Sequence, residues 1–276
     1  MADDLPTPIE TRTMKRIGYA LGTLLIAIPL VSLAEPLGQG ELVKLDTRPG
    51  VTQGIFITTP RQTPPKAVMV LYSGGEGRLH LEADGPSKSR DNFVIRTASY
   101  WIDHGYAVVQ VDVPSDHWRD GLSAYTRRTP DILADQKVVS AEIRKRFPGV
   151  KVVLYGTSNG TATEGNILMG APELADLYVL TSPVSIARKY IGIADLDVPQ
   201  AYRDRTMLMS NENDGCPAAR YSGAQRLVSK NGLTLITESS TEDGGEECGP
   251  ESPHGYLGIE AKALADSDAW IASKLN

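Results

Sequence analysis

The residues with the clearest catalytic potential lie where an apolar run meets a serine flanked by glycines. Residues 152–155 are Val-Val-Leu-Tyr, and they lead directly into Gly-Thr-Ser-Asn-Gly at residues 156–160. A nucleophilic serine on a sharp strand-to-helix turn needs small neighbours, because the strand and the helix approach each other closely there. The pattern therefore predicts that Ser158 is a nucleophile and that a helix follows over residues 161–169. The alternative is a glycine-rich turn with an inert serine.

A nucleophilic serine needs a general base, and the base needs a carboxylate that orients it. Only one histidine, His254, follows Ser158 in the chain, so we predict that His254 is the base. The other histidines are His80, His104 and His117, and they all precede the serine. We expect structural or surface roles for these three, with His80 and His117 at the mouth of the site as an alternative.

The acid is expected between the serine and the histidine, because Ser, acid, His is a known chain order for such triads. The stretch 205–210, which contains the apolar run 207–209, leads into Asn-Glu-Asn-Asp-Gly, and we predict that Asp214 in this turn is the acid. Glu212 is the nearest alternative. Asp195 and Asp197 are further alternatives, but they precede the run.

Acyl transfer also needs donors for the developing oxyanion, usually two backbone N–H groups. One normally belongs to the residue after the nucleophile, which here is Asn159. The second is expected in the glycine-rich turn after the run 67–72, where we assign Gly75, with Gly74 as the alternative. A phosphate-binding loop is not favoured there, because no Gly-Lys-Ser/Thr follows.

Alternating strands and helices must position these residues. From the third onward the apolar runs are continuous, which indicates strands buried on both faces, and the first two indicate an antiparallel hairpin at the edge of the sheet. Helices are predicted at 93–104 and 131–147 and at the end of the chain. This order predicts an α/β fold with a mostly parallel, doubly wound sheet of about eight strands flanked by helices. The predicted strands are 42–45, 54–58, 67–72, 107–113, 152–155, 177–180, 207–209 and 233–236.

Five motifs together resemble the α/β-hydrolase superfamily, in particular exported bacterial serine hydrolases of unassigned substrate. They are Ser-Gly-Gly at 73–75, Val-Asp-Val-Pro-Ser-Asp at 111–116, the serine motif, Asn-Asp-Gly-Cys at 213–216 and His-Gly-Tyr-Leu-Gly-Ile-Glu at 254–260. The resemblance covers most of residues 40–276. It implies the α/β-hydrolase fold, a Ser158–Asp214–His254 triad and an acyl-enzyme mechanism. Ser73 stands where many members have histidine.

The N-terminal segment has the three-part composition of a signal peptide. Residues 17–31 carry no charge, follow Lys15-Arg16 and precede Ser-Leu-Ala at 32–34. Fifteen residues are fewer than the about 20 that a membrane-spanning helix needs. We therefore predict a signal peptide over residues 1–34, with Met14 as an alternative start, and a single domain over 35–276. The mature protein is expected in the periplasm or outside the cell, an uncleaved membrane anchor being the alternative.

The two cysteines lie close in sequence to the predicted acid and base. Cys216 follows Asp214 by two residues, and Cys248 precedes His254 by six. An exported chain meets an oxidising environment, so we predict a disulfide between them. It would tie the acid loop to the histidine loop.

The overall composition is that of an ordinary globular protein, with 41% hydrophobic and 22% charged residues. A net charge of -6 argues against nucleic acid as a partner, which requires a basic surface. The sequence lacks a His-x-x-x-His motif, and the predicted mechanism needs neither metal nor organic cofactor. We therefore predict a serine hydrolase that cleaves a carboxylic ester of small-molecule or polymeric origin. The alternatives are an acyltransferase or peptidase with the same triad, or a non-catalytic binding protein.

Two segments bear on access to the site. The loop before His254 is rich in acidic residues, which we interpret as a solvated loop, the alternatives being an acidic rim that repels anions or a calcium site. Only about two dozen residues separate the run 177–180 from the next strand, so we predict a short cap insert and an open mouth. The polar stretch 76–92 is a long insertion beside the oxyanion loop. The acidic residues are Glu242, Asp243, Glu246, Glu247 and Glu251.

Overall fold

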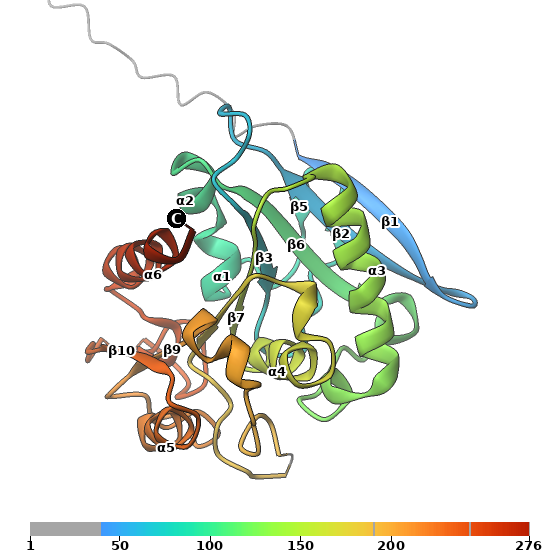
Figure 1. Ribbon diagram of the computed structural model, residues 1–276. Helices are drawn as coiled ribbons and strands as arrows, with labels where there is room; N and C mark the ends of the chain where they lie inside the picture. Colours follow the sequence, from blue (N-terminus) through green and yellow to red (C-terminus); the bar gives the residue numbers. More distant parts are fainter. Residues whose placement is uncertain (1–39, 190, 243, 276) are drawn as a thin grey trace, which may run out of the picture. The chain divides into compact units, whose positions relative to one another are not determined.

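One eight-stranded sheet carries the apolar runs of the sequence (Figure 1). The computed structural model describes residues 40–275 except 190 and 243, so the predicted signal peptide lies outside the described residues. Along the sheet the order is β1-β2-β6-β3-β7-β8-β9-β10. The strands are β1 Glu41–Arg48, β2 Val51–Thr58, β3 Val68–Tyr72, β6 Ala107–Pro114, β7 Val152–Thr157, β8 Leu177–Thr181, β9 Thr206–Asn211 and β10 Thr234–Glu238.

The sheet is parallel from β6 to β10, and β2 is antiparallel to both of its neighbours. The predicted fold class and the predicted edge hairpin are therefore confirmed. Parallel strands present their carboxyl ends at one edge of the sheet, where ligands of such folds bind. Four strands that are neighbours in the sheet, β3, β7, β8 and β9, end at this edge, so the loops that follow them meet there.

Strands β3, β6, β7, β8 and β9 are buried along their whole length, as the continuous apolar runs predict. The same prediction is wrong for the last strand. In β10 only Glu238 is buried, because β10 is at the edge of the sheet and pairs only with β9. Apolar character alone does not distinguish an edge strand from a central one.

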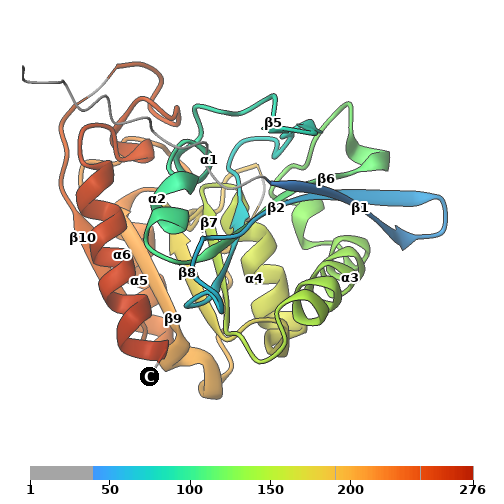
Figure 2. The same ribbon diagram turned by 90° about the horizontal axis from the view of Figure 1, so that it is seen from above.

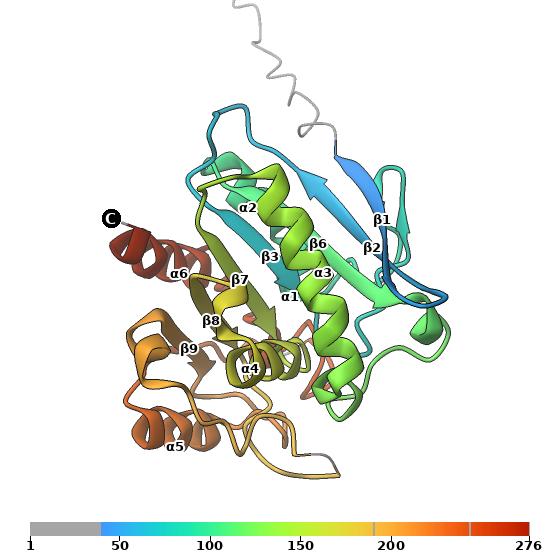
Figure 3. The same cartoon turned by 45° about the vertical axis from the view of Figure 1, so that its right-hand side comes forward.

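Helices cover both faces of the sheet, with α3 and α6 on opposite sides (Figure 2). One core contains side chains of α3, α4 and α5, and the other contains side chains of α1, α2 and α6. Figure 3 shows α3 and α4 in front of the sheet. The helices are α1 Phe93–Arg96, α2 Ala98–Asp103, α3 Pro130–Arg146, α4 Gly160–Gly170, α5 Tyr221–Asn231 and α6 Glu260–Leu275.

Two helices differ from the prediction. The helix expected over 93–104 is divided into α1 and α2 at Thr97, whose hydroxyl donates a hydrogen bond to the carbonyl of Phe93 at 2.6 Å. Threonine hydroxyls compete in this way with the regular helical pattern. Helix α5 was not predicted, because its sequence is largely polar; Ala224 and Leu227 nevertheless bury their side chains in the sheet core.

The insertion at 76–92 is fixed to the sheet by a buried carboxylate. It contains the short strands β4 Leu81–Glu82 and β5 Gly85–Pro86, which pair with each other. Asp112 on β6 accepts backbone hydrogen bonds from Leu79 at 2.8 Å and from Leu81 at 3.0 Å. The insertion therefore has a defined position beside the loop after β3.

The segment between β8 and β9 contains the 3-10 helix η4, Gln200–Arg205. None of the helices in the described part of the chain has both the length and the hydropathy that a membrane crossing requires.

Candidate active site

Ser158 lies on the turn between β7 and α4, in a backbone conformation that is rare for serine. Its φ is 51°, in the left-handed region, and a non-glycine residue held there costs about 1–3 kcal/mol. Its N–H donates to the carbonyl of Thr181 on β8 at 3.0 Å. A Cβ added at Gly160 would collide with the carbonyl of Tyr72, and one added at Gly156 would collide with the Glu164 carboxyl. Both flanking glycines are thus required by close approach, as the sequence pattern predicts.

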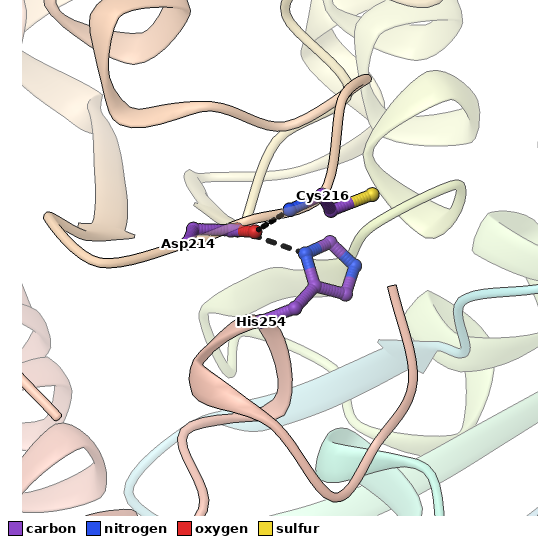
Figure 4. Close-up of side chains that lie close together, drawn as sticks. All are labelled: Asp214, Cys216 and His254. Atoms are coloured by element: carbon purple, nitrogen blue, oxygen red, sulfur yellow. Dashed lines mark hydrogen bonds and ion pairs between the residues drawn. The ribbon is translucent and has the colours of Figure 1, made fainter. Parts of the chain in front are cut away.

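Asp214 and His254 are hydrogen-bonded to each other in the interior of the protein (Figure 4). The distance from His254 Nδ1 to Asp214 Oδ2 is 2.8 Å, and both residues are buried. The other carboxylate oxygen accepts the backbone N–H of Cys216 at 2.8 Å. Of the alternative acids, Glu212 is exposed, and Asp195 pairs with Arg128.

Ser158 and His254 line the same pocket, which has a volume of about 180 Å³. The Nε2 atom of His254 is buried and has no hydrogen-bond partner among the described residues. His80 and His117 are not among the residues that line this pocket, and His80 instead stacks on Trp118 with ring centroids 4.1 Å apart. The remaining lining residues are Gly74, Gly75, Ser89, Asp91, Asn92, Phe93, Thr157, Cys248, Pro250 and Gly255.

The two predicted oxyanion donors lie on loops that contact each other. The side-chain amide of Asn159 donates to the carbonyl of Gly75 at 3.1 Å. Gly75 has a φ of 56°, a backbone conformation that residues other than glycine rarely adopt. Within the described part of the chain, the backbone N–H of neither residue donates a hydrogen bond to another residue. Both N–H groups are therefore free to bind a ligand oxygen.

Residues that the sequence analysis did not identify hold the histidine loop in place. Ser182, at the end of β8, donates its hydroxyl to the carbonyl of His254 at 2.7 Å. The hydroxyl of Tyr256 accepts the N–H of Ser182 at 3.0 Å, and Asn211 donates to the carbonyl of Pro253 at 3.1 Å. Ser182 and Tyr256 also have positive φ angles, 41° and 59°. Tyr256 lies in the motif at 254–260, but the motif does not predict these contacts, because they join segments far apart in the sequence.

A disulfide joins Cys216 to Cys248, as predicted. It connects the acid loop to the segment before His254. Asp214, Cys216 and His254 also have potential ligand atoms within 4.8 Å of one another, the one such group in the described residues. Cysteine ligates a metal as the thiolate, whereas the sulfur of Cys216 is bonded to Cys248. This donor set does not fit a metal ion while the disulfide is intact.

A fully buried carboxyl group lies beneath the turn of the nucleophile. Glu164 on α4 lies against Gly156, and neither of its carboxyl oxygens has a hydrogen-bond partner among the described residues. Burial raises the pKa of Glu164 well above its ordinary value. Burial also lowers the pKa of nearby Arg127 to about 10.

Comparison with known proteins identifies the fold. Neither a protein-family model nor a curated protein matches the chain. Among solved structures, an esterase from Pyrococcus furiosus has a TM-score of 0.60 at 12% identity, covering 87% of this chain and 94% of its own.

A serine hydrolase without a lid from Xanthomonas campestris has a TM-score of 0.56 at 14% identity, covering 83% of this chain and 94% of its own. A cold-adapted esterase from an Arctic intertidal metagenomic library has a TM-score of 0.55 at 13% identity, and the match covers 86% of this chain and 94% of the esterase. This chain has the α/β-hydrolase fold.

Proposed function

We propose that the protein is a serine hydrolase that cleaves a carboxylic ester through an acyl-enzyme on Ser158. The observation that carries the proposal is the arrangement around one pocket. His254 contacts Asp214 through Nδ1, its Nε2 has no partner among the described residues, and the residue lines the pocket that Ser158 also lines. A histidine oriented in this way is suited to act as a general base.

The mechanism follows from these positions. Nε2 of His254 takes the proton of the Ser158 hydroxyl as the serine oxygen attacks the ester carbonyl. Asp214 orients the imidazole and stabilises its charged form. The backbone N–H groups of Gly75 and Asn159 stabilise the oxyanion. When the tetrahedral intermediate collapses, the alcohol leaves with the proton from His254. Water then repeats the sequence, releasing the acid and restoring the serine.

A short acyl group suits the pocket best. Its volume of about 180 Å³ is below the range of about 300–1,000 Å³ that is typical of sites for drug-sized ligands. The segment between β8 and β9 contributes no residue to the lining, which supports an open site with only a short cap. The similar structures from Pyrococcus furiosus and the Arctic library are esterases, which agrees with ester cleavage. Peptidase and acyltransferase activities would use the same residues.

We also propose that the chain is exported. The pattern of residues 1–34 supports this, and so does the disulfide, since disulfides persist mainly in oxidising compartments. Export would deliver the enzyme to esters outside the cytoplasm.

A fluorophosphonate probe tests the proposed function directly, because it reacts only with an activated serine. Labelling of the protein over residues 35–276 is expected at Ser158 by peptide mass mapping. The label should be absent from the variants Ser158→Ala and His254→Ala. Hydrolysis of p-nitrophenyl acetate should disappear with the label. A folded wild-type protein that neither labels nor hydrolyses esters would contradict the proposal and favour a binding protein.

A further inference from the structure

The side chain of Asn92 is unusual because it makes no hydrogen bond to another residue in the described part of the chain. It occupies the N-cap position of α1, where asparagine usually accepts a backbone hydrogen bond, yet its side chain makes no capping hydrogen bond. Its Oδ1 atom is buried without a partner among the described residues. No hydrogen bond joins its Nδ2 atom to another residue of the described chain. Asn92 as a whole is half-buried, and a buried polar atom without a partner is costly, so we expect this side chain to take part in binding a ligand.

The amide of Asn92 lies beside the nucleophile. A Cβ added at Gly74 would lie 3.1 Å from Asn92 Nδ2 and 3.0 Å from the Cβ of Ser158. The amide and the serine therefore flank the same glycine, which directly precedes the proposed oxyanion donor Gly75. Asn92, Ser158 and His254 also line one pocket. An amide in this position is within reach of a substrate acyl group.

The backbone around Asn92 is fixed, so the position from which its side chain extends is set before a ligand binds. The N–H of Asn92 donates to the carbonyl of Ser89 at 3.1 Å, and its own carbonyl accepts the N–H of Ile95 at 2.9 Å. The ring of the next residue, Phe93, packs against the ring of Tyr256 with centroids 4.8 Å apart. Ser89 has a positive φ of 52°. A polar group positioned in this way discriminates between substrates more strongly than a mobile one.

We propose that Asn92 is a specificity-determining residue that donates a hydrogen bond from Nδ2 to an oxygen in the acyl group of the substrate. This inference rests on the proposed esterase function and defines its substrate class. The preferred substrates are esters of short acyl groups that carry an ether, hydroxyl or keto oxygen near the reacting carbonyl. An apolar acyl group of the same shape would leave the amide unpaired, which is the basis of strong discrimination.

Two p-nitrophenyl esters of matched shape test the proposal. Butyrate and methoxyacetate differ by one methylene replaced by an ether oxygen. The preference is the ratio of kcat/KM for methoxyacetate to that for butyrate, divided by the same ratio for hydroxide-catalysed hydrolysis. In Asn92→Ala we expect this preference to fall about 5- to 20-fold, the effect of one hydrogen bond. Asn92→Asp, which keeps the shape but removes the donor, should lower it at least as much.

Ser87→Ala is the matched control, because Ser87 is exposed in the same insertion and does not line the pocket. It should keep the wild-type preference. An unchanged preference in both Asn92 variants would overturn the proposal. So would an equal loss of kcat on both esters, which would instead make Asn92 an oxyanion donor. A wild-type protein that hydrolyses neither ester would overturn the proposed function itself.

Discussion

The two halves of the site use their polar groups differently. On the acid and histidine side, a disulfide and hydrogen bonds from Ser182 and Asn211 hold the loops together. On the nucleophile and oxyanion side, the side chains of Asn92 and Glu164 have buried oxygens without partners among the described residues. In the first half, hydrogen bonds fix the orientation of His254. The second half has fewer such contacts between its loops, and it leaves these two side-chain oxygens without a partner, as the first half leaves Nε2 of His254.

Removing the orienting contact of the acid and histidine side should have the largest effect. Asp214→Asn replaces the carboxylate that accepts from His254, so the imidazole loses its preferred tautomer. We expect kcat for p-nitrophenyl acetate to fall about 10⁴-fold, measured by steady-state kinetics. Glu212→Gln, at an exposed carboxylate two residues away, is the control and should change kcat less than about two-fold. A comparable loss in Glu212→Gln would reassign the acid.

The covalent link on the same side should contribute mainly to stability. Cys216→Ser combined with Cys248→Ser opens a loop between residues 32 apart in sequence. On chain entropy the free energy of unfolding should fall by about 3–4 kcal/mol, which urea denaturation would measure. Wild-type protein in excess dithiothreitol should show the same decrease. If neither change lowers stability, the link does not constrain the unfolded chain as expected.

Adding a methyl group at Gly74 tests how closely the loop after β3 packs against the nucleophile. In Gly74→Ala the new Cβ would lie 3.0 Å from the Cβ of Ser158, so the nucleophile has to shift. We expect kcat to fall about 10- to 100-fold, since small displacements of reacting groups are costly. Gly50→Ala has no neighbour within 4 Å but a φ of 74°, so it should lower stability by about 1 kcal/mol and leave kcat unchanged. Equal activity in both variants would contradict this close fit.

The buried carboxyl beneath the nucleophile should give a smaller, pH-dependent effect. The pKa of Glu164 is raised in the folded protein, so the folded state binds more protons than the unfolded state above about pH 4.5. The contribution of this group is therefore most favourable at low pH and decreases as the pH rises toward the folded pKa.

Glu164→Gln removes this dependence. The stability of the wild type relative to the variant should fall by up to about 1.4 kcal/mol per pH unit between pH 5 and 7. Denaturation at several pH values measures this difference. A difference that is constant with pH would mean that Glu164 is ionised in both states.

The sequence was most informative where one local requirement determines the residue type. The strand, the glycines and the serine of residues 152–160 predicted the turn correctly, because close approach excludes larger side chains. The sequence was less informative about α1 and α2, where Thr97 interrupts the helix through its own hydroxyl. Helix α5 was missed although Ala224, Leu227 and Val228 are spaced for one helical face, because the rest of the segment is polar.

Residue types and their spacing were enough to predict the α/β class, the order of the strands along the chain and the candidate nucleophile, acid and base. Only the tertiary structure decided which polar groups meet. Ser182 reaches His254, and Asn92 reaches the edge of the nucleophile's pocket, because the sheet brings together the loops that follow separate strands. Such contacts depend on distances between segments remote in sequence. Residue type and spacing along the chain do not encode those distances.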